Sequence, residues 1–202
     1  MSSTSSMSNA ASVRHLTPIT ATPETLKGYG WLIGPDKTPV REKIDFYDEV
    51  DVRQPAAFHS NQDTCLNLVS FRPRGLDVRW MEYHVKHTQT FIPLSGMPFY
   101  MVLGKPTNVD PATGLESDGV ALPDPESVQA FYFDGSGGLV MDVGVWHEVP
   151  FPARDETHFV CICTNETNDN LETQGADGEC NGGDLTKRNI AKQFGYTFQV
   201  SP

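Results

Sequence analysis

The chain has 202 residues, the length of one ordinary domain, and can bury a hydrophobic core without a scaffold of disulfides. Acidic residues outnumber basic residues by 26 to 15, so the formal net charge is −11. A surface of that charge repels a phosphate backbone, which argues against nucleic acid as a partner. No apolar run approaches the roughly 18 residues of a membrane span, so no membrane partner is expected.

The N-terminal residues are small and polar and lack the apolar segment of a secretory signal. We expect residues 1–15 to form a disordered tail and residues 16–202 to form a single domain. None of the four cysteines belongs to a CxxC pair, which predicts reduced thiols and a cytoplasmic protein. These cysteines are Cys65, Cys161, Cys163 and Cys180.

In chain order, the first predicted element is a short helix that begins at Thr22-Pro23-Glu24 and ends at Gly28 and Gly30. Beyond residue 63, turn residues separate segments that have the composition of strands. The predicted strands cover residues 65–72, 76–86, 89–94, 98–103, 128–133, 138–143, 145–149 and 157–164. The segments 104–127 and 165–184 predict loops, and 185–195 predicts one short helix. Short strands without alternating helices predict an all-β sandwich or barrel.

Two remote strands carry polar side chains that alternation directs to one face. In the strand over 78–86, Trp80, Glu82 and His84 share a face, and in the strand over 139–149 His147 shares its face with apolar residues. Inward polar side chains from different strands of a small barrel meet in its mouth. Glu and His there can transfer protons or hold a metal. The plainer alternatives are a solvent-facing stripe and a core histidine.

The spacing Glu82-x-His84-x4-Gln89, followed much later by His147, resembles the cupin pattern. In that pattern His-x-His-x(3–4)-Glu is followed by a third His on a later strand. Here Glu replaces the first His, and Gln, a poor metal ligand, replaces the Glu. The resemblance implies that a divalent metal, if present, is weakly held, and it leaves the participation of a metal open.

A closer resemblance lies in the stretch from Met81 to Pro93, which reads MEYHVKHTQTFIP. It resembles the signature of the ureidoglycolate lyase family, which reads much like LE-x-H-x3-TQ-x-F-[IV]-P. The stretch from Gly144 to His147 is similar to the family's G-[VT]-WH element. Looser similarities involve Leu26 to Ile33, Phe71-Arg72, Phe99 to Leu103, Pro123-Asp124 and Ala130-Phe131. Together the matches cover roughly residues 23–165.

The departures from the family pattern leave the substrate identity open. Glu148 and Asp142 stand where many bacterial members carry His, and Gln129 stands where the family tends to have Arg. His87 and the insert over 106–122 are additional.

The resemblance implies a cupin-type double-stranded β-helix barrel with a short N-terminal helix and a core over about 20–165. It further implies a homodimer that splits ureidoglycolate into glyoxylate and urea, in the breakdown of allantoin and purines. Elimination needs a base at the hydroxyl and an acid at the leaving nitrogen, and we expect Glu82, His84 and His147 to share these roles. A cation must bind the small-molecule carboxylate substrate, and Arg72 suits bidentate binding. Gln89 and Trp80 are the further substrate-binding candidates.

Two other classes of function stay open. One is a metal-dependent cupin isomerase, lyase or dioxygenase that acts on another small hydroxy or keto acid. In it Glu82, His84, His87 and His147 would hold the divalent ion. The other is a non-catalytic module that only binds a small ligand. Metal content and a bell-shaped pH–rate profile distinguish these classes from each other and from the lyase.

Overall fold

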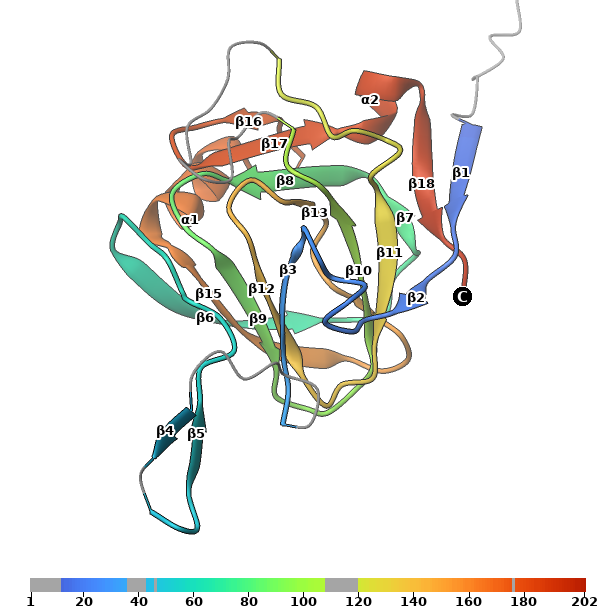
Figure 1. The fold of residues 1–202 in the computed structure, drawn as a ribbon. Coiled ribbons are helices and arrows are strands. Elements are labelled where there is room, and N and C mark those ends of the chain that lie inside the picture. The colour runs from blue at the N-terminus through green and yellow to red at the C-terminus, as the bar shows by residue number, and fades with distance from the viewer. Residues whose placement is uncertain (1–11, 36–42, 46, 108–119, 176) are drawn as a thin grey trace, which may run out of the picture.

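Two β-sheets dominate the structure, a computed structural model that describes residues 12–35, 43–45, 47–107, 120–175 and 177–202 (Figure 1). The eight-stranded sheet has the order β16-β17-β8-β13-β10-β11-β2, and β14 also pairs with β10. The five-stranded sheet has the order β3-β12-β9-β15-β6.

The strands of the larger sheet are β2 (Ile19–Thr20), β8 (Trp80–His84), β10 (Phe99–Gly104), β11 (Gln129–Phe133), β13 (Trp146–His147), β14 (Phe151–Pro152), β16 (Cys180–Asn181) and β17 (Leu185–Asn189). Those of the smaller sheet are β3 (Gly30–Ile33), β6 (Thr64–Phe71), β9 (Gln89–Pro93), β12 (Gly138–Met141) and β15 (Thr157–Thr164). A three-stranded sheet holds β1 (Ser12–Leu16), β18 (Tyr196–Val200) and β7 (Asp77–Val78). The hairpin of β4 (Lys43–Asp45) and β5 (Asp51–Arg53) projects from the body (Figure 1). The helices are α1 (Asn165–Gln174) and α2 (Ile190–Phe194).

An apolar core fills the space between the two main sheets. Phe91 and Phe159 come from the smaller sheet, and Phe99, Met101 and Phe131 come from the larger sheet, all at most 3% exposed. The rings of Phe99 and Phe159 pack edge to face across this space, with centroids 4.8 Å apart. Burial of such large side chains on both inner faces holds the sheets together.

A second core covers the outer face of the larger sheet. Tyr83 and Trp146 lie there in edge-to-face contact, with ring centroids 4.5 Å apart. Ile190 of α2 and Phe198 of β18 belong to the same cluster, and Figure 1 shows both elements on that side of the barrel. Because Tyr83 and Trp146 point outward, their neighbours along β8 and β13 point into the barrel.

The predicted all-β class is confirmed, and the two facing sheets around one core are those of a cupin-type barrel. The barrel is open, since no ladder among the described residues joins the two main sheets. None of the helices in the described part of the chain combines the length and the apolar character of a membrane span.

The N-terminal predictions are wrong in two places. Residues 12–15 of the expected tail belong to β1, which ends at Leu16 and pairs in parallel with β18, while residues 1–11 lie outside the described residues. The expected helix is a run of turns over residues 23–29. Thr22 Oγ1 accepts a hydrogen bond from Thr25 N at 3.2 Å, as a helix cap would. Gly28, with φ at 86°, then turns the chain toward β3 before a helix can extend.

The C-terminal predictions also need correction. The expected loop over 165–184 begins with α1, whose N-cap Thr164 accepts a hydrogen bond from Thr167 N. The predicted core over about 20–165 ends too early, because β17 adds a strand to the larger sheet and β18 covers its outer face. The expected short helix within 185–195 is present as α2.

Candidate active site

Three adjacent strands place the candidate residues side by side on the inner face of the larger sheet. In the register of β8 and β13, His147 lies directly opposite Glu82. In the register of β8 and β17, Lys187 lies directly opposite Glu82 on the other side. His84 lies two residues farther along β8, on the same face. The sheet therefore holds a row of Lys187, Glu82 and His147, with His84 beside it.

His147 presents a lone pair to Glu82. Its Nδ1 lies 3.0 Å from the carbonyl oxygen of Val145, which can only accept, so Nδ1 carries the proton. In the neutral imidazole Nε2 then carries the lone pair, and this atom lies 3.6 Å from Glu82 Oε1, beyond a direct hydrogen bond. His147 is 1% exposed, and its Nε2 has no hydrogen-bond partner. The gap between the two atoms can receive a polar atom of a ligand.

His84 presents a second lone pair to the same place. Thr167 Oγ1 donates its single proton to Asp184 at 3.0 Å, so it accepts from His84 Nδ1 at 3.3 Å. This leaves the buried Nε2 of His84 as an acceptor without a partner. The rings of His84 and His147 have centroids 5.3 Å apart, so the predicted convergence of the two remote strands is present.

The protonation states follow from burial and neighbouring charge. Burial, together with His87 and His147, lowers the pKa of His84 to about 3, so its imidazole is neutral at pH 7. Burial alone would raise the pKa of Glu82, but His147, His84 and Lys187 lower it below its usual range. The site therefore combines an ionised carboxylate with a neutral His84.

A cavity of about 260 Å³ opens onto this row. Its lining includes Trp80, Glu82, His147, Glu148 and Lys187. The Lys187 ammonium lies 4.6 Å from the centre of the Trp80 ring, which is a cation–π distance. The cavity has the size of a site for a small organic molecule. Trp80, a predicted substrate-binding residue, thus lines it.

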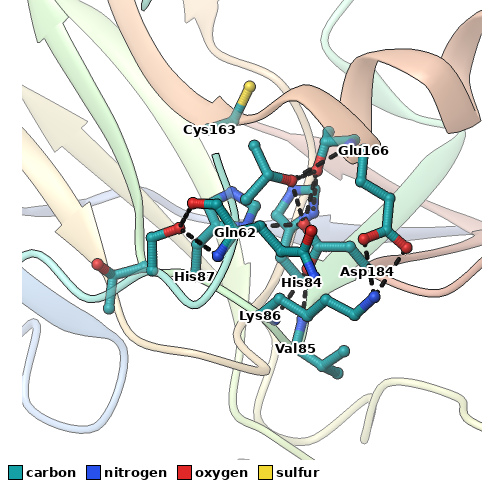
Figure 2. Close-up of polar contacts among 12 residues, drawn as sticks. Gln62, His84, Val85, Lys86, His87, Cys163, Glu166 and Asp184 are labelled. Carbon is teal, nitrogen blue, oxygen red and sulfur yellow. Dashed lines mark hydrogen bonds and ion pairs between the residues drawn. The ribbon is translucent and has the colours of Figure 1, made fainter. Parts of the chain in front are cut away.

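Behind His84, a second cluster lies inside the protein (Figure 2). Asp184 Oδ2 lies 2.9 Å from His87 Nδ1, and both side chains are fully buried. Asp184 also accepts hydrogen bonds from the Lys86 backbone at 2.8 Å and from the hydroxyls of Thr164 and Thr167. Burial would raise the pKa of Asp184, but His87, His84 and Thr164 lower it well below its usual range. This carboxylate holds the histidines from behind.

Glu148 closes one edge of the cavity. Its oxygens accept hydrogen bonds from the backbone N–H groups of Trp80 and Val149, each at 3.2 Å, and Arg74 lies 3.8 Å away. Burial raises the pKa of Glu148 to about 7, although Arg74 and the Trp80 amide oppose the shift. Arg74 is itself held by the carbonyls of Val149 and Pro150.

The structure does not bring Arg72 to this site, so its predicted role as the carboxylate ligand has no structural support. Arg72 follows β6, the edge strand of the other sheet, and its side chain is 82% exposed beside Glu156. Gln89 lies on the same face of β9 as the core residue Phe91, and its buried Oε1 has no hydrogen-bond partner. His87 belongs to the cluster around Asp184 rather than to the cavity lining.

Sequence reasoning missed Lys187 and Asp184, which lie in the segment expected to be loop and helix. Lys187 could have been found only by predicting the strand β17. The sequence of that strand, LTKRN, has no alternating apolar pattern that would indicate a strand. Asp184 follows two glycines and reads as a turn residue.

Two groups of side chains have the donor atoms of a divalent metal site. They are Glu82 with His84 and His147, and His84 with His87 and Asp184, each with ligand atoms within 4.8 Å of one another. The first group fits an ion, because the Nε2 atoms of both histidines are buried without partners beside a carboxylate. The second group also has unpartnered nitrogens, those of His87, but it fits less well because Asp184 already accepts hydrogen bonds from hydroxyl and amide groups.

Comparison with known proteins points to one family. The ureidoglycolate lyase of Azotobacter vinelandii is 31% identical over 90 residues, which are 45% of this chain and 46% of that protein. The ureidoglycolate lyases of Pseudomonas fluorescens and Pseudomonas putida are each 30% identical over 106 residues, which are 50% of this chain and 56% of each protein. The chain thus spans about half the length of the curated relatives it matches. A family model described as ureidoglycolate lyase matches residues 13–181, and the chain belongs to the ureidoglycolate lyase family.

Proposed function

We propose that this chain is a ureidoglycolate lyase, which cleaves the carbon–nitrogen bond of ureidoglycolate to give glyoxylate and urea. Family membership supports this reaction, and the close approach of Glu82, His84 and His147, of which Glu82 and His147 line the cavity, carries the assignment of the site. The substrate carbon bears a hydroxyl, a ureido nitrogen and a carboxylate. When the hydroxyl loses its proton, its electrons form the carbonyl of glyoxylate, and the electrons of the broken bond pass to the ureido nitrogen.

The hydroxyl proton ends on the leaving nitrogen, so one imidazole can perform both transfers. His147 suits this role because its Nδ1 is anchored on Val145 and its Nε2 faces the cavity. The Glu82 carboxylate, 3.6 Å away, stabilises the imidazolium that forms between the two transfers. His84 is a weak base because its pKa is about 3, and it accepts a hydrogen bond from the substrate instead.

As a second candidate, we propose that Glu82, His84 and His147 hold a divalent ion weakly. A bound ion would polarise the substrate oxygens as a Lewis acid. The unpartnered Nε2 atoms favour this candidate. With a bound ion, the chain could also be a metal-dependent cupin enzyme that acts on another small hydroxy or keto acid.

The test is incubation of the purified protein with racemic ureidoglycolate, with glyoxylate, urea and ammonia measured separately. Glyoxylate and urea in equal amounts, formed above the spontaneous rate, support the lyase. Ammonia in place of urea points to hydrolysis, and the absence of turnover points to another small acid or to a binding module. Elemental analysis of the same sample, before and after chelation, decides whether a metal is needed.

We also propose a homodimer formed through the outer face of the five-stranded sheet. Strand registers place Leu66, Ile162, Thr90, Val140 and Trp31 in one mostly apolar row on that face, and Leu68 lies beside them. Leu66 and Leu68 are 69% and 70% exposed, and Trp31 is 40% exposed. Burial of such an apolar row between two copies is favourable. Light scattering should give twice 22.3 kDa, and a Leu66→Glu/Leu68→Glu variant should give the monomer mass.

A cytoplasmic location is part of the proposal. All four thiols are free, and the Sγ atoms of Cys65 and Cys163 lie 3.6 Å apart. A reducing compartment keeps such a pair as thiols. Cell fractionation checks the location. Ureidoglycolate turnover there would place the chain in allantoin and purine catabolism.

A further inference from the structure

We propose that Lys187 binds the carboxylate of the substrate, so that the segment after the family match completes the site. The proposal rests on the proposed lyase function, because it concerns the same cavity. The family match ends at residue 181, and Lys187 lies six residues beyond it on β17.

Lys187 faces the reaction site because of strand register. It lies directly opposite Glu82 in the pairing of β17 with β8, and His147 lies opposite Glu82 on the other side. Neighbouring strands lie about 4.8 Å apart, so Lys187 and His147 stand one strand on either side of Glu82. A substrate with its carboxylate at Lys187 therefore has its hydroxyl carbon over Glu82 and within reach of His147.

The surroundings of Lys187 are those of a binding residue. The residue is 6% exposed, which is unusual for a lysine, and its ammonium lies 4.6 Å from the centre of the Trp80 ring. Both side chains line the cavity of about 260 Å³ with Glu82 and His147. The packing on Trp80 holds the flexible stem in place, so less freedom is lost when an anion binds.

Two arginines near Lys187 and the cavity make contacts elsewhere. The neighbouring Arg188 points to the opposite face of β17, where it donates to the carbonyls of Ala121 and Cys180. Arg74 donates to the carbonyls of Val149 and Pro150 beside Glu148. The lining of the cavity contains Lys187 as its cation. A carboxylate ligand in a chain of net charge −11 needs such a local positive group.

The experiment compares Lys187→Met with the wild type by calorimetric binding of two probes, glyoxylate and its neutral amide, and by steady-state kinetics. Methionine keeps the stem length over Trp80 and removes the charge. Loss of one charge-assisted hydrogen bond should weaken glyoxylate binding by about 10- to 100-fold and raise KM similarly. Binding of the neutral amide should change by less than about twofold, a selectivity that a purely structural role would not produce.

Two variants complete the test. Lys192→Met removes a charge of the same kind from an exposed position paired with Glu179, and should leave both probes and KM unchanged. Lys187→Arg keeps a cation and should recover most of the glyoxylate affinity. If Lys187→Met does not fold, the wild-type preference for glyoxylate over the amide and its retention in Lys187→Arg carry the test.

The outcomes separate the two proposals. A wild type that binds glyoxylate through Lys187 but does not cleave ureidoglycolate overturns the lyase and keeps the anion site. A wild type that cleaves ureidoglycolate, with KM and glyoxylate affinity unchanged in Lys187→Met, overturns the role of Lys187 and keeps the lyase.

Discussion

His84 lies between two regions of the barrel interior that share residue types but differ in how their polar atoms are satisfied. On the side of Asp184, here called the saturated side, the carboxylate receives hydrogen bonds from the Lys86 backbone and from the hydroxyls of Thr164 and Thr167. Beside it, His87 Nε2 has no hydrogen-bond partner, and His87 Nδ1 makes only the ion-pair contact with Asp184. On the side of Glu82, the Nε2 atoms of His84 and His147 have no partner and a cavity opens onto the row. The saturated side orients the histidines, and the unsatisfied side is where a ligand replaces the missing hydrogen bonds.

This difference implies that the clusters around Asp184 and Glu82 have different roles, although they contain the same types of residue. Buried polar groups without partners cost stability, so a protein keeps them where a ligand or an ion fills the gap. A carboxylate whose oxygens already accept several hydrogen bonds, as in Asp184, stabilises one side-chain geometry instead. Substitutions on the two sides should therefore separate in their effects on turnover and on stability.

The largest expected effect is on the unsatisfied side. His147→Ala removes the proposed proton carrier and should lower kcat by about 10²- to 10⁴-fold. The free energy of unfolding should fall by less than for a substitution of Asp184, because His147 makes one hydrogen bond, from Nδ1 to the Val145 carbonyl, whereas Asp184 accepts several. Steady-state kinetics and guanidinium unfolding measure the two effects. A kcat within threefold of the wild type would contradict the assignment of His147.

The next effect belongs to the saturated side. Asp184→Asn replaces a buried anion that accepts several hydrogen bonds, and should lower the free energy of unfolding by about 3 kcal/mol. Turnover should fall as well, because His84 loses its orientation through Thr167. Asp169→Asn, at an exposed position of α1, is the matched control and should change neither quantity. Loss of turnover without loss of stability would place Asp184 on the chemical side instead.

The third effect concerns Glu148 at the edge of the cavity and develops only as the pH rises. The pKa of Glu148 is about 7 in the folded protein and 4.5 as its ordinary value, so the folded state holds this proton more strongly. Its stabilisation is present below pH 4.5 and is lost as the pH rises to 7, by about 3 kcal/mol in all. Glu148→Gln should therefore gain stability relative to the wild type between pH 4.5 and 7.

Guanidinium unfolding at several pH values measures this gain as a difference between the two proteins. The comparison of two proteins is needed because His84 changes the pH dependence of stability in the opposite direction. Its pKa is lowered to about 3, so the free energy of unfolding rises with pH between 3 and 6.5. That contribution is common to both proteins. Glu156→Gln, a more exposed acid beside Arg72, is the control and should show no such trend. A pH-independent difference for Glu148→Gln would contradict the raised pKa.

The smallest effect is expected at Arg72. Its side chain is 82% exposed on the far sheet, and its contact with Glu156 is 3.9 Å long. Arg72→Ala should change KM by less than about twofold and the free energy of unfolding by less than about 0.5 kcal/mol. A tenfold rise in KM would show that Arg72, rather than Lys187, anchors the carboxylate.

The sequence predicts the strands and the inner face of β8 and β13 because alternation is a local signal. Glu82, His84 and His147 follow from that alternation and from the family pattern. Lys187 and Asp184 do not, since their place depends on the pairing of β17 with β8, about a hundred residues apart in the chain. The strand β1 was missed for the same reason, as its partner β18 lies at the other end of the chain. Arg72 was misplaced because the sequence does not show which sheet a strand joins, and β6, which precedes Arg72, lies at the edge of the other sheet.

The most direct test of the account is the rate of glyoxylate and urea release by the wild type and by Glu82→Gln, at saturating ureidoglycolate and equal protein concentration. Glutamine keeps the shape of Glu82 but cannot stabilise the imidazolium of His147. The account predicts equal amounts of the two products from the wild type, and a kcat at least about 10²-fold lower for a Glu82→Gln protein that circular dichroism shows to be folded. Equal rates from the two proteins, or no release above the spontaneous rate by the wild type, would contradict it.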